Sequence, residues 1–108
     1  MSRDTEKIKS LMVHVIIYRE EDYYLAHCLE FDLAAQGNNI QESFQNLLDA
    51  VELQTAYALE TGDLENLIQP APPEFWRMLF KSQNNTELYN NIKLPEILSD
   101  IECGVVCG

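Results

Sequence analysis

Residues 24–32, YLAHCLEFD, bring a histidine, a cysteine and two carboxylates together within nine positions. Imidazole, thiolate and carboxylate groups bind zinc and serve hydrolases as bases and nucleophiles. If the segment is a β-strand, however, His27 and Cys28 point to opposite faces of the sheet, because successive side chains alternate. Two such groups can neither grip one metal ion nor form a base–nucleophile pair. The segment therefore indicates a structural strand rather than a catalytic centre.

The other groups with possible chemistry fit a structural role as well. The same alternation places Glu30 on the face of Cys28, where a carboxylate keeps a thiol protonated and unreactive. His14 lies between valines in an apolar stretch. Together with His27 and Glu30 it supplies the ligand types of a metal-dependent hydrolase, and this alternative stays open. The leading expectation is a protein without a catalytic residue, a bound metal or a cofactor.

Cys103 and Cys107 form a second candidate metal or redox motif near the end of the sequence. Three residues separate them, whereas two residues are typical of zinc knuckles and redox pairs. The three cysteines of the chain are an odd number and do not make a disulfide framework, which favours a reducing cytoplasmic location.

The first half of the chain predicts a β-meander. Residues 11–18, LMVHVIIY, are rich in β-branched side chains and indicate a strand, and the charged residues 19–22 indicate a turn. Residues 23–30 predict a second strand in an antiparallel hairpin, and about 32–36 a third.

A long amphipathic helix over residues 40–61 is predicted next. Asn39 suits its N-cap, Glu42 completes a capping box, and Gly62 suits the left-handed residue that ends a helix. Its apolar stripe recurs at steps of three and four residues, and comprises Phe44, Leu47, Leu48, Val51, Thr55 and Ala58. The helix must bury this stripe against the sheet.

The second half predicts shorter elements. A helical piece is expected over residues 64–68, a proline-rich break at 70–73 and a further helix at 74–82. The fold class is therefore α+β, with a three- to four-stranded antiparallel sheet packed on one long helix and short C-terminal helices. We assign residues 1–69 to this α+β domain and residues 70–108 to a helical extension and tail.

The charge balance restricts the partners. Eighteen acidic and seven basic residues give a formal charge of −11. Such a field repels phosphate backbones, so direct nucleic-acid binding is not expected, whereas complementary charge favours a basic protein. No apolar run reaches the roughly 20 residues that span a bilayer, so no membrane association is expected.

Residues 13–62 resemble the HicB-like antitoxin family. The resemblance rests on the apolar first strand with its charged turn, on the tyrosine-containing segment 23–32, and on Ala-Gln-Gly at 35–37 ahead of the helix. Asn39 stands where the family usually has a threonine cap, and Ser43 where it usually has alanine; the glutamate between them is kept. The similarity covers about half of the chain.

This resemblance implies a sheet packed on one long helix, similar to a partial ribonuclease H fold without its catalytic carboxylates. It also implies an antitoxin of a toxin–antitoxin system, which binds a small basic ribonuclease of the HicA type and masks its active site. Many members carry a C-terminal segment for operator DNA. Residues 83–108 contain Lys93 as their only basic residue, so operator binding is not expected here.

The acidic rim of the hairpin is the expected partner surface. It comprises Glu20, Glu21, Asp22, Tyr23, Glu30 and Asp32. We also expect a homo-oligomer. An alternative function is a stand-alone structural or regulatory subunit without a toxin, which would associate through the hairpin edge or through the helix that carries Phe75 and Trp76.

Overall fold

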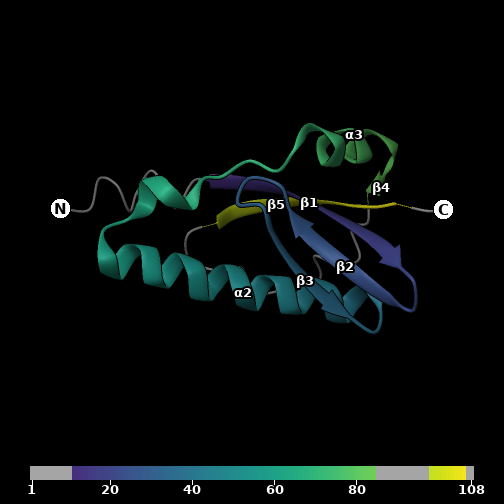
Figure 1. Ribbon diagram of the computed structural model, residues 1–108, viewed down its shortest axis with the longest axis horizontal. Helices are drawn as coiled ribbons and strands as arrows, with labels where there is room; N and C mark the ends of the chain where they lie inside the picture. Colours follow the sequence, from purple (N-terminus) through teal and green to yellow (C-terminus); the bar gives the residue numbers. More distant parts are fainter. Residues whose placement is uncertain (1–10, 85–97, 107–108) are drawn as a thin grey trace.

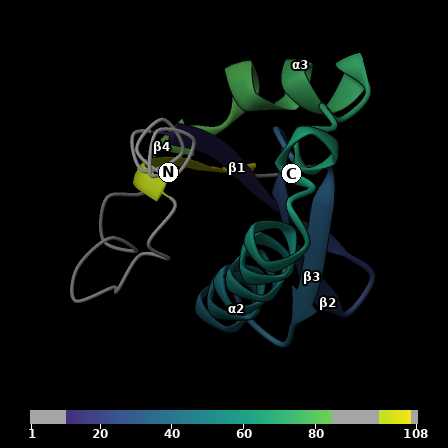
Figure 2. The same ribbon diagram turned by 90° about the vertical axis from the view of Figure 1, so that its left-hand side faces the viewer.

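The computed structural model describes residues 11–84 and 98–106, which form one mixed β-sheet with a helix on each face (Figure 1). The spatial order of its strands is β3-β2-β1-β5-β4. The strands are β1 (Leu11–Glu20), β2 (Tyr23–Cys28), β3 (Leu33–Gly37), the two-residue β4 (Gln83–Asn84) and β5 (Leu98–Val105). The long helix α2 (Ile40–Thr61) covers one face and α3 (Pro73–Lys81) the other, and the short 3₁₀ helix η1 (Leu64–Leu67) lies between them in sequence (Figure 2).

The predicted meander is present. β1 and β2 form an antiparallel hairpin in which Glu20 pairs with Tyr23, so the turn consists of Glu21 and Asp22. Glu21 has a φ of 49°, a left-handed conformation that a two-residue turn between twisted strands requires. β3 pairs antiparallel with β2. The second strand ends at Cys28, two residues earlier than expected, and this difference changes the position of Glu30.

The prediction of an antiparallel sheet is wrong at one strand pair. β5 runs parallel to β1, with Val13 beside Ile101 and Val15 beside Cys103, so the sheet is mixed. The segment 70–108, expected as a helical extension and tail, thus contributes β4 and β5 to the same sheet. Residues 101–105 alternate between apolar and small or polar side chains, IECGV, which is the period of a strand.

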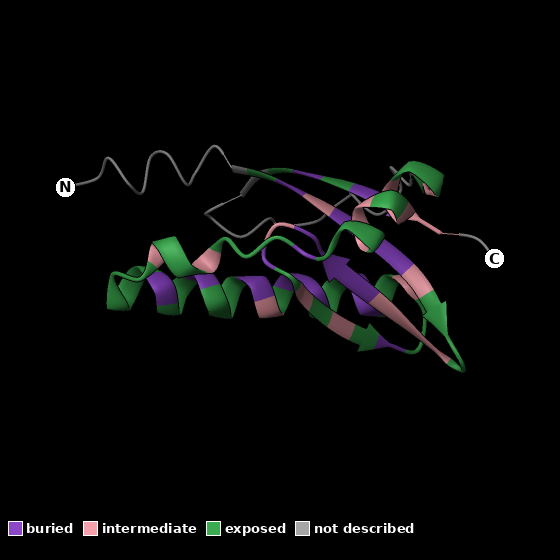
Figure 3. Ribbon diagram, turned by 45° about the horizontal axis from the view of Figure 1, so that its top comes forward, coloured by how far each residue is buried: buried purple, intermediate pink, exposed green. Residues whose placement is uncertain are grey.

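The hydrophobic core lies between the sheet and α2. Alternate residues of β1, β2, β3 and β5 face the helix, and buried residues line the side of α2 that meets them (Figure 3). The main members from the strands are Val13, Val15, Ile17, Ala26, Cys28, Ile101 and Cys103, and those from α2 are Phe44, Leu47, Leu48 and Val51. The predicted stripe of the helix is therefore confirmed as the surface that holds the sheet.

The ends of α2 follow the predicted capping chemistry with one difference. The side chain of Asn39 accepts a hydrogen bond from the backbone N–H of Glu42 at 2.8 Å, and Gly62 ends the helix with a φ of 70°. The carboxylate of Glu42 reaches back to the N–H of Asn38 at 2.8 Å, one residue before the cap. Gly37 is required just ahead, because a Cβ there would lie 2.4 Å from the backbone nitrogen of Ser43.

A smaller apolar cluster holds α3 against the opposite face. Ile16, Leu29 and Ala71 are buried there, and Tyr18, Phe75, Trp76, Met78 and Leu79 pack against them. No residue of α3 is itself fully buried. The helix therefore rests on this face as a partial cover, and it leaves polar groups of the sheet close to solvent.

Candidate functional site

The polar side chains of the sheet gather on the face beneath α3. In β1, His14 and Ile16 point to this face, and Ile16 is paired with His27 of β2. His14 is paired with Glu102 of β5. The predicted separation of His27 and Cys28 is confirmed, because Cys28 belongs to the core under α2, whereas the ring of His27 contacts Phe75 of α3.

Glu30 and His14 make two short polar contacts on this face. One carboxylate oxygen of Glu30 accepts a hydrogen bond from the backbone N–H of His14 at 2.7 Å, and the other accepts one from its ring Nδ1 at 2.6 Å. The expectation that Glu30 shares the face of Cys28 is therefore wrong. β2 ends at Cys28, so strand alternation no longer governs Glu30, and its side chain turns towards His14.

The backbone around Glu30 explains why a carboxylate is needed at this position. The N–H of Leu29 donates to the carbonyl of His14, which continues the ladder, but the carbonyl of Leu29 accepts from Ala71. The carbonyl of Glu30 similarly accepts from Gln69. The N–H of His14 has thus lost its usual strand partner, and the Glu30 carboxylate takes the place of that carbonyl.

His27 forms a second pair with a carboxylate. Its Nε2 donates to Asp32 Oδ1 at 2.7 Å, and its ring meets Phe75 edge-on with centroids 4.6 Å apart. Among the described residues no group hydrogen-bonds the buried Nδ1 of His27. Asp32 adopts a φ of 50°, so the turn after β2 is shaped to place this carboxylate.

The two pairs do not converge on a common point. His14 uses Nδ1 for Glu30, and its Nε2 lies 3.2 Å from Glu102, on the far side of the ring. His27 is occupied separately by Asp32. Within residues 11–84 and 98–106, no three His, Cys, Asp or Glu side chains are placed to hold one metal ion. His14, His27 and Glu30, the residues of the hydrolase alternative, are therefore not brought to a common point in the described part of the chain.

The described cysteines are buried on the α2 side. Burial is the largest cause that raises the pKa of Cys28, to about 12, and the charge of Glu30 adds to it. Burial also raises the pKa of Cys103 to about 12. Thiols in this state are poor nucleophiles and poor metal ligands. Cys107, the second cysteine of the predicted motif, lies outside the described residues.

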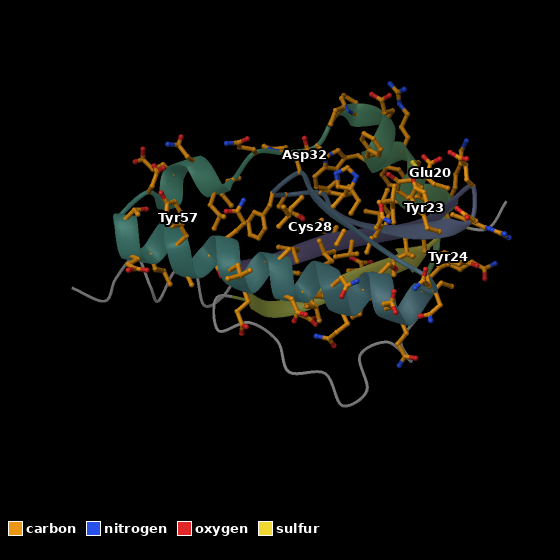
Figure 4. All side chains as sticks on the ribbon, turned by 60° about the horizontal axis from the view of Figure 1, so that its bottom comes forward. Glu20, Tyr23, Tyr24, Cys28, Asp32 and Tyr57 are labelled. Atoms are coloured by element: carbon orange, nitrogen blue, oxygen red, sulfur yellow. The ribbon has the colours of Figure 1, made fainter. Side chains whose placement is uncertain are left out.

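The residues expected to contact a partner form two separate groups. Glu20, Glu21 and Asp22 are exposed around the hairpin turn, with Tyr23 half-buried beside them. Asp32 lies near the other end of β2, well away from Glu20 and Tyr23 (Figure 4). The four steps from Tyr23 to His27 correspond to roughly 13 Å of strand. Glu30 and Asp32 also bind histidines of their own chain, whereas Glu20, Glu21 and Asp22 form no ion pair within the described residues.

A groove between α3 and β5 is the feature that the sequence did not indicate. It has a volume of about 430 Å³ and is lined by His14, Trp76, Leu79, Phe80, Ser82, Glu102, Cys103 and Gly104. Glu102 was not recognised because residues 98–105 were not assigned to a strand. The alternation of residues 101–105 was the available signal, since it places Glu102 opposite the core residues Ile101 and Cys103.

Comparison with known proteins adds no relative. No family model, no curated protein and no solved structure matches the chain. Among the described helices, none combines the length and the apolar character that crossing a bilayer demands.

The role of Glu30 can be tested by stability. Glu30→Gln replaces a charged acceptor of two hydrogen bonds by a neutral one, so we expect the free energy of unfolding to fall by about 1 to 2 kcal/mol. Glu21→Gln removes the same charge from an exposed turn and should change it by less than about 0.5 kcal/mol. Urea unfolding of both variants measures the difference. If Glu30→Gln and Glu21→Gln unfold with the same free energy, the carboxylate of Glu30 does not stabilise the fold.

The state of Cys28 can be tested by thiol labelling. With its pKa raised from 9.0 to about 12, its thiolate fraction at pH 8 is far lower than in the unfolded chain. We expect alkylation of Cys28, followed by peptide mass spectrometry, to be at least about 100-fold slower than in urea. A cysteine at exposed position 34, introduced as Ala34→Cys, should react at the unfolded rate.

The raised pKa of Cys28 also makes the stability of the fold depend on pH. Because the folded-state pKa is the higher one, the contribution of the neutral thiol is present below pH 9 and is lost as the pH rises towards 12. Rapid labelling of Cys28 in the native protein at pH 8 would contradict its burial.

Proposed function

We propose that this protein is a non-catalytic binding protein, and that it acts as a HicB-like antitoxin that masks a small basic ribonuclease. The observation that carries the proposal is that some charged groups of the protein are paired with one another and others are not. The histidines and their carboxylates are engaged with one another, while the acidic turn of the hairpin has no ion-pair partner among the described residues. A surface of this kind attracts a basic protein and performs no chemistry.

The distribution of charge supports this reading. The charged residues of α2 are all acidic, namely Glu42, Asp49, Glu52 and Glu60, and all are exposed. With a net charge of −11, the protein has a negative field around it that accelerates encounter with a cation-rich surface. The exposed carboxylates at the tip of the β1–β2 hairpin then give this attraction a definite position.

The fold is compatible with the family resemblance without being specific to it. Three strands in a meander are followed by one long helix that packs on them, as expected of a HicB-like domain. The parallel strand β5 extends this sheet on the side of β1. The proposal of a toxin partner therefore rests on the resemblance of residues 13–62 and on charge, and a binding experiment must decide it.

The experiment uses the product of the gene next to that of this protein, which the proposal requires to be a small basic ribonuclease. Its association with this chain is measured by biolayer interferometry, and its effect on growth by co-expression. Glu20→Gln, Glu21→Gln and Asp22→Asn together remove three charges from the hairpin turn. We expect the association rate to fall about fivefold or more, because these groups direct the encounter.

A matched control separates local from overall charge. Asp49→Asn, Glu52→Gln and Glu60→Gln remove three exposed charges from α2, and we expect a change in association rate below about twofold. The ribonuclease should arrest growth alone and lose this effect with the wild-type protein. If the wild-type protein fails to protect growth, the proposed function is wrong. If both triple variants lose association rate equally, the hairpin turn is not the docking surface.

A homo-oligomeric subunit without a toxin is the second candidate. β3 lies at one edge of the sheet, and its sequence LAAQG contains no charged residue. Uncharged edge strands have unpaired backbone groups that readily pair with another chain. Trp76 is half-buried, its Nε1 donates to the carbonyl of Ala71 and its ring lies against His14, so only part of its surface is open to a second copy.

Self-association through β3 predicts a distinct response. Ala34→Glu places a charge on the exposed side of this strand and should convert an oligomer to a monomer in sedimentation velocity runs. Ala56→Glu, on the exposed surface of α2, should leave the sedimentation coefficient unchanged. Salt should strengthen pairing of two acidic copies but weaken binding of a basic ribonuclease. A wild-type protein that is monomeric at every salt concentration would exclude this candidate.

A further inference from the structure

The groove between α3 and β5 combines aromatic walls with an acidic floor. Trp76, Leu79 and Phe80 of α3 form one side, and His14 and Glu102 lie at the base. The sides of an ordinary apolar pocket would attract any hydrophobic group. Glu102, the one carboxylate in the lining of this groove, makes it selective for positive charge.

The charge at the floor is not balanced by the chain's described residues. His14 lies between Glu30 at 2.6 Å and Glu102 at 3.2 Å, so one imidazole faces two carboxylates. Even a protonated imidazole would compensate only one of them. Glu30 is held by two hydrogen bonds from His14, whereas the side chain of Glu102 is 49% exposed. No described lysine or arginine pairs with it. Glu102 is therefore the carboxylate that can meet an incoming cation.

The aromatic walls are fixed and incompletely covered. The indole Nε1 of Trp76 donates to the carbonyl of Ala71 at 3.1 Å, and the ring is tilted by 59° against His14. These contacts hold the indole in one orientation at the groove. Phe80 is 87% exposed, so most of its ring is open to a ligand in the groove. A planar cation that covers these rings would remove apolar area from water and gain a cation–π contact.

We infer that this groove binds an arginine side chain of a basic protein partner, with the guanidinium against Trp76 and Phe80 and paired with Glu102. Arginine fits better than lysine, because its flat group can stack on an aromatic ring and can also donate two hydrogen bonds to one carboxylate. An anion is disfavoured by Glu30 and Glu102. A metal ion is disfavoured because the nitrogen and oxygen donors do not converge.

The inference goes beyond the proposed antitoxin function and can succeed or fail independently of it. The groove lies on the α3 side of β5, whereas the acidic turn joins β1 and β2. A ribonuclease could bind at the turn without using the groove, and the groove could accept a basic partner that is not a toxin. The test therefore uses a peptide as the probe and does not need the ribonuclease.

Trp76 is the only tryptophan of the chain, so its emission and its indole N–H resonance report on the groove directly. The probe is an acetylated and amidated Gly-Arg-Gly peptide, and the controls replace arginine by citrulline or by lysine. We expect saturable shifts of the indole resonance with the arginine peptide. Citrulline keeps the shape but loses the charge, and should bind at least about tenfold more weakly.

Two variants and one matched control complete the experiment. Glu102→Gln should weaken the arginine peptide at least about fivefold, and Phe80→Ala at least about threefold; both side chains are exposed enough to be replaced without loss of folding. Asp49→Asn changes the charge equally on the opposite helix and should have no effect. Unchanged affinity in Glu102→Gln, equal binding of citrulline, or no shift of the indole would each overturn the inference. Equal binding of lysine would overturn the assignment of a guanidinium.

Discussion

The contact between the carboxylate of Glu30 and two nitrogens of His14, the backbone N–H and the ring Nδ1, is the interaction on which the arrangement of this protein depends. It replaces a backbone carbonyl at the point where β2 ends. The carbonyl of Leu29 is thereby left for Ala71, and the connection from η1 to α3 can cross the end of the sheet. α3 then covers the polar face, with Phe75 over His27 and Trp76 over His14. One side chain thus substitutes for a strand partner and fixes the orientation of an imidazole.

The two faces of the sheet have different roles as a result. The α2 face is apolar and holds the core, so Cys28 and Cys103 are thiols in a hydrophobic layer, with their pKa raised by burial. The α3 face carries the histidines, each with its own carboxylate. This division prevents thiol and imidazole from meeting across the sheet. It also leaves one half-exposed carboxylate, that of Glu102, beside an aromatic wall.

The sequence predicted the features that depend on neighbouring residues. The stripe of α2, its cap at Asn39 and the left-handed Gly62 are local patterns, and so is the alternation that separates His27 from Cys28. The position of Glu30 was not predictable in the same way, because it depends on where β2 stops, and that is decided by the pairing of residues 69–71 with residues 29–30. The parallel strand β5 was missed because it pairs with a strand more than 80 positions away. Only the period of residues 101–105 indicated it.

The residues of the expected partner surface are close in the sequence but have different roles in the fold. Six residues around the hairpin were grouped because they are close in the sequence. In the fold, the carboxylates of Glu30 and Asp32 each bind a histidine, and the energy of those pairs belongs to folding. Glu20, Glu21 and Asp22 are exposed, and no ion pair within the described residues neutralises the charge of their carboxylates. The strongest electrostatic attraction from this hairpin should therefore come from its tip, because at the other end the charge of Asp32 is already shared with His27 through Oδ1.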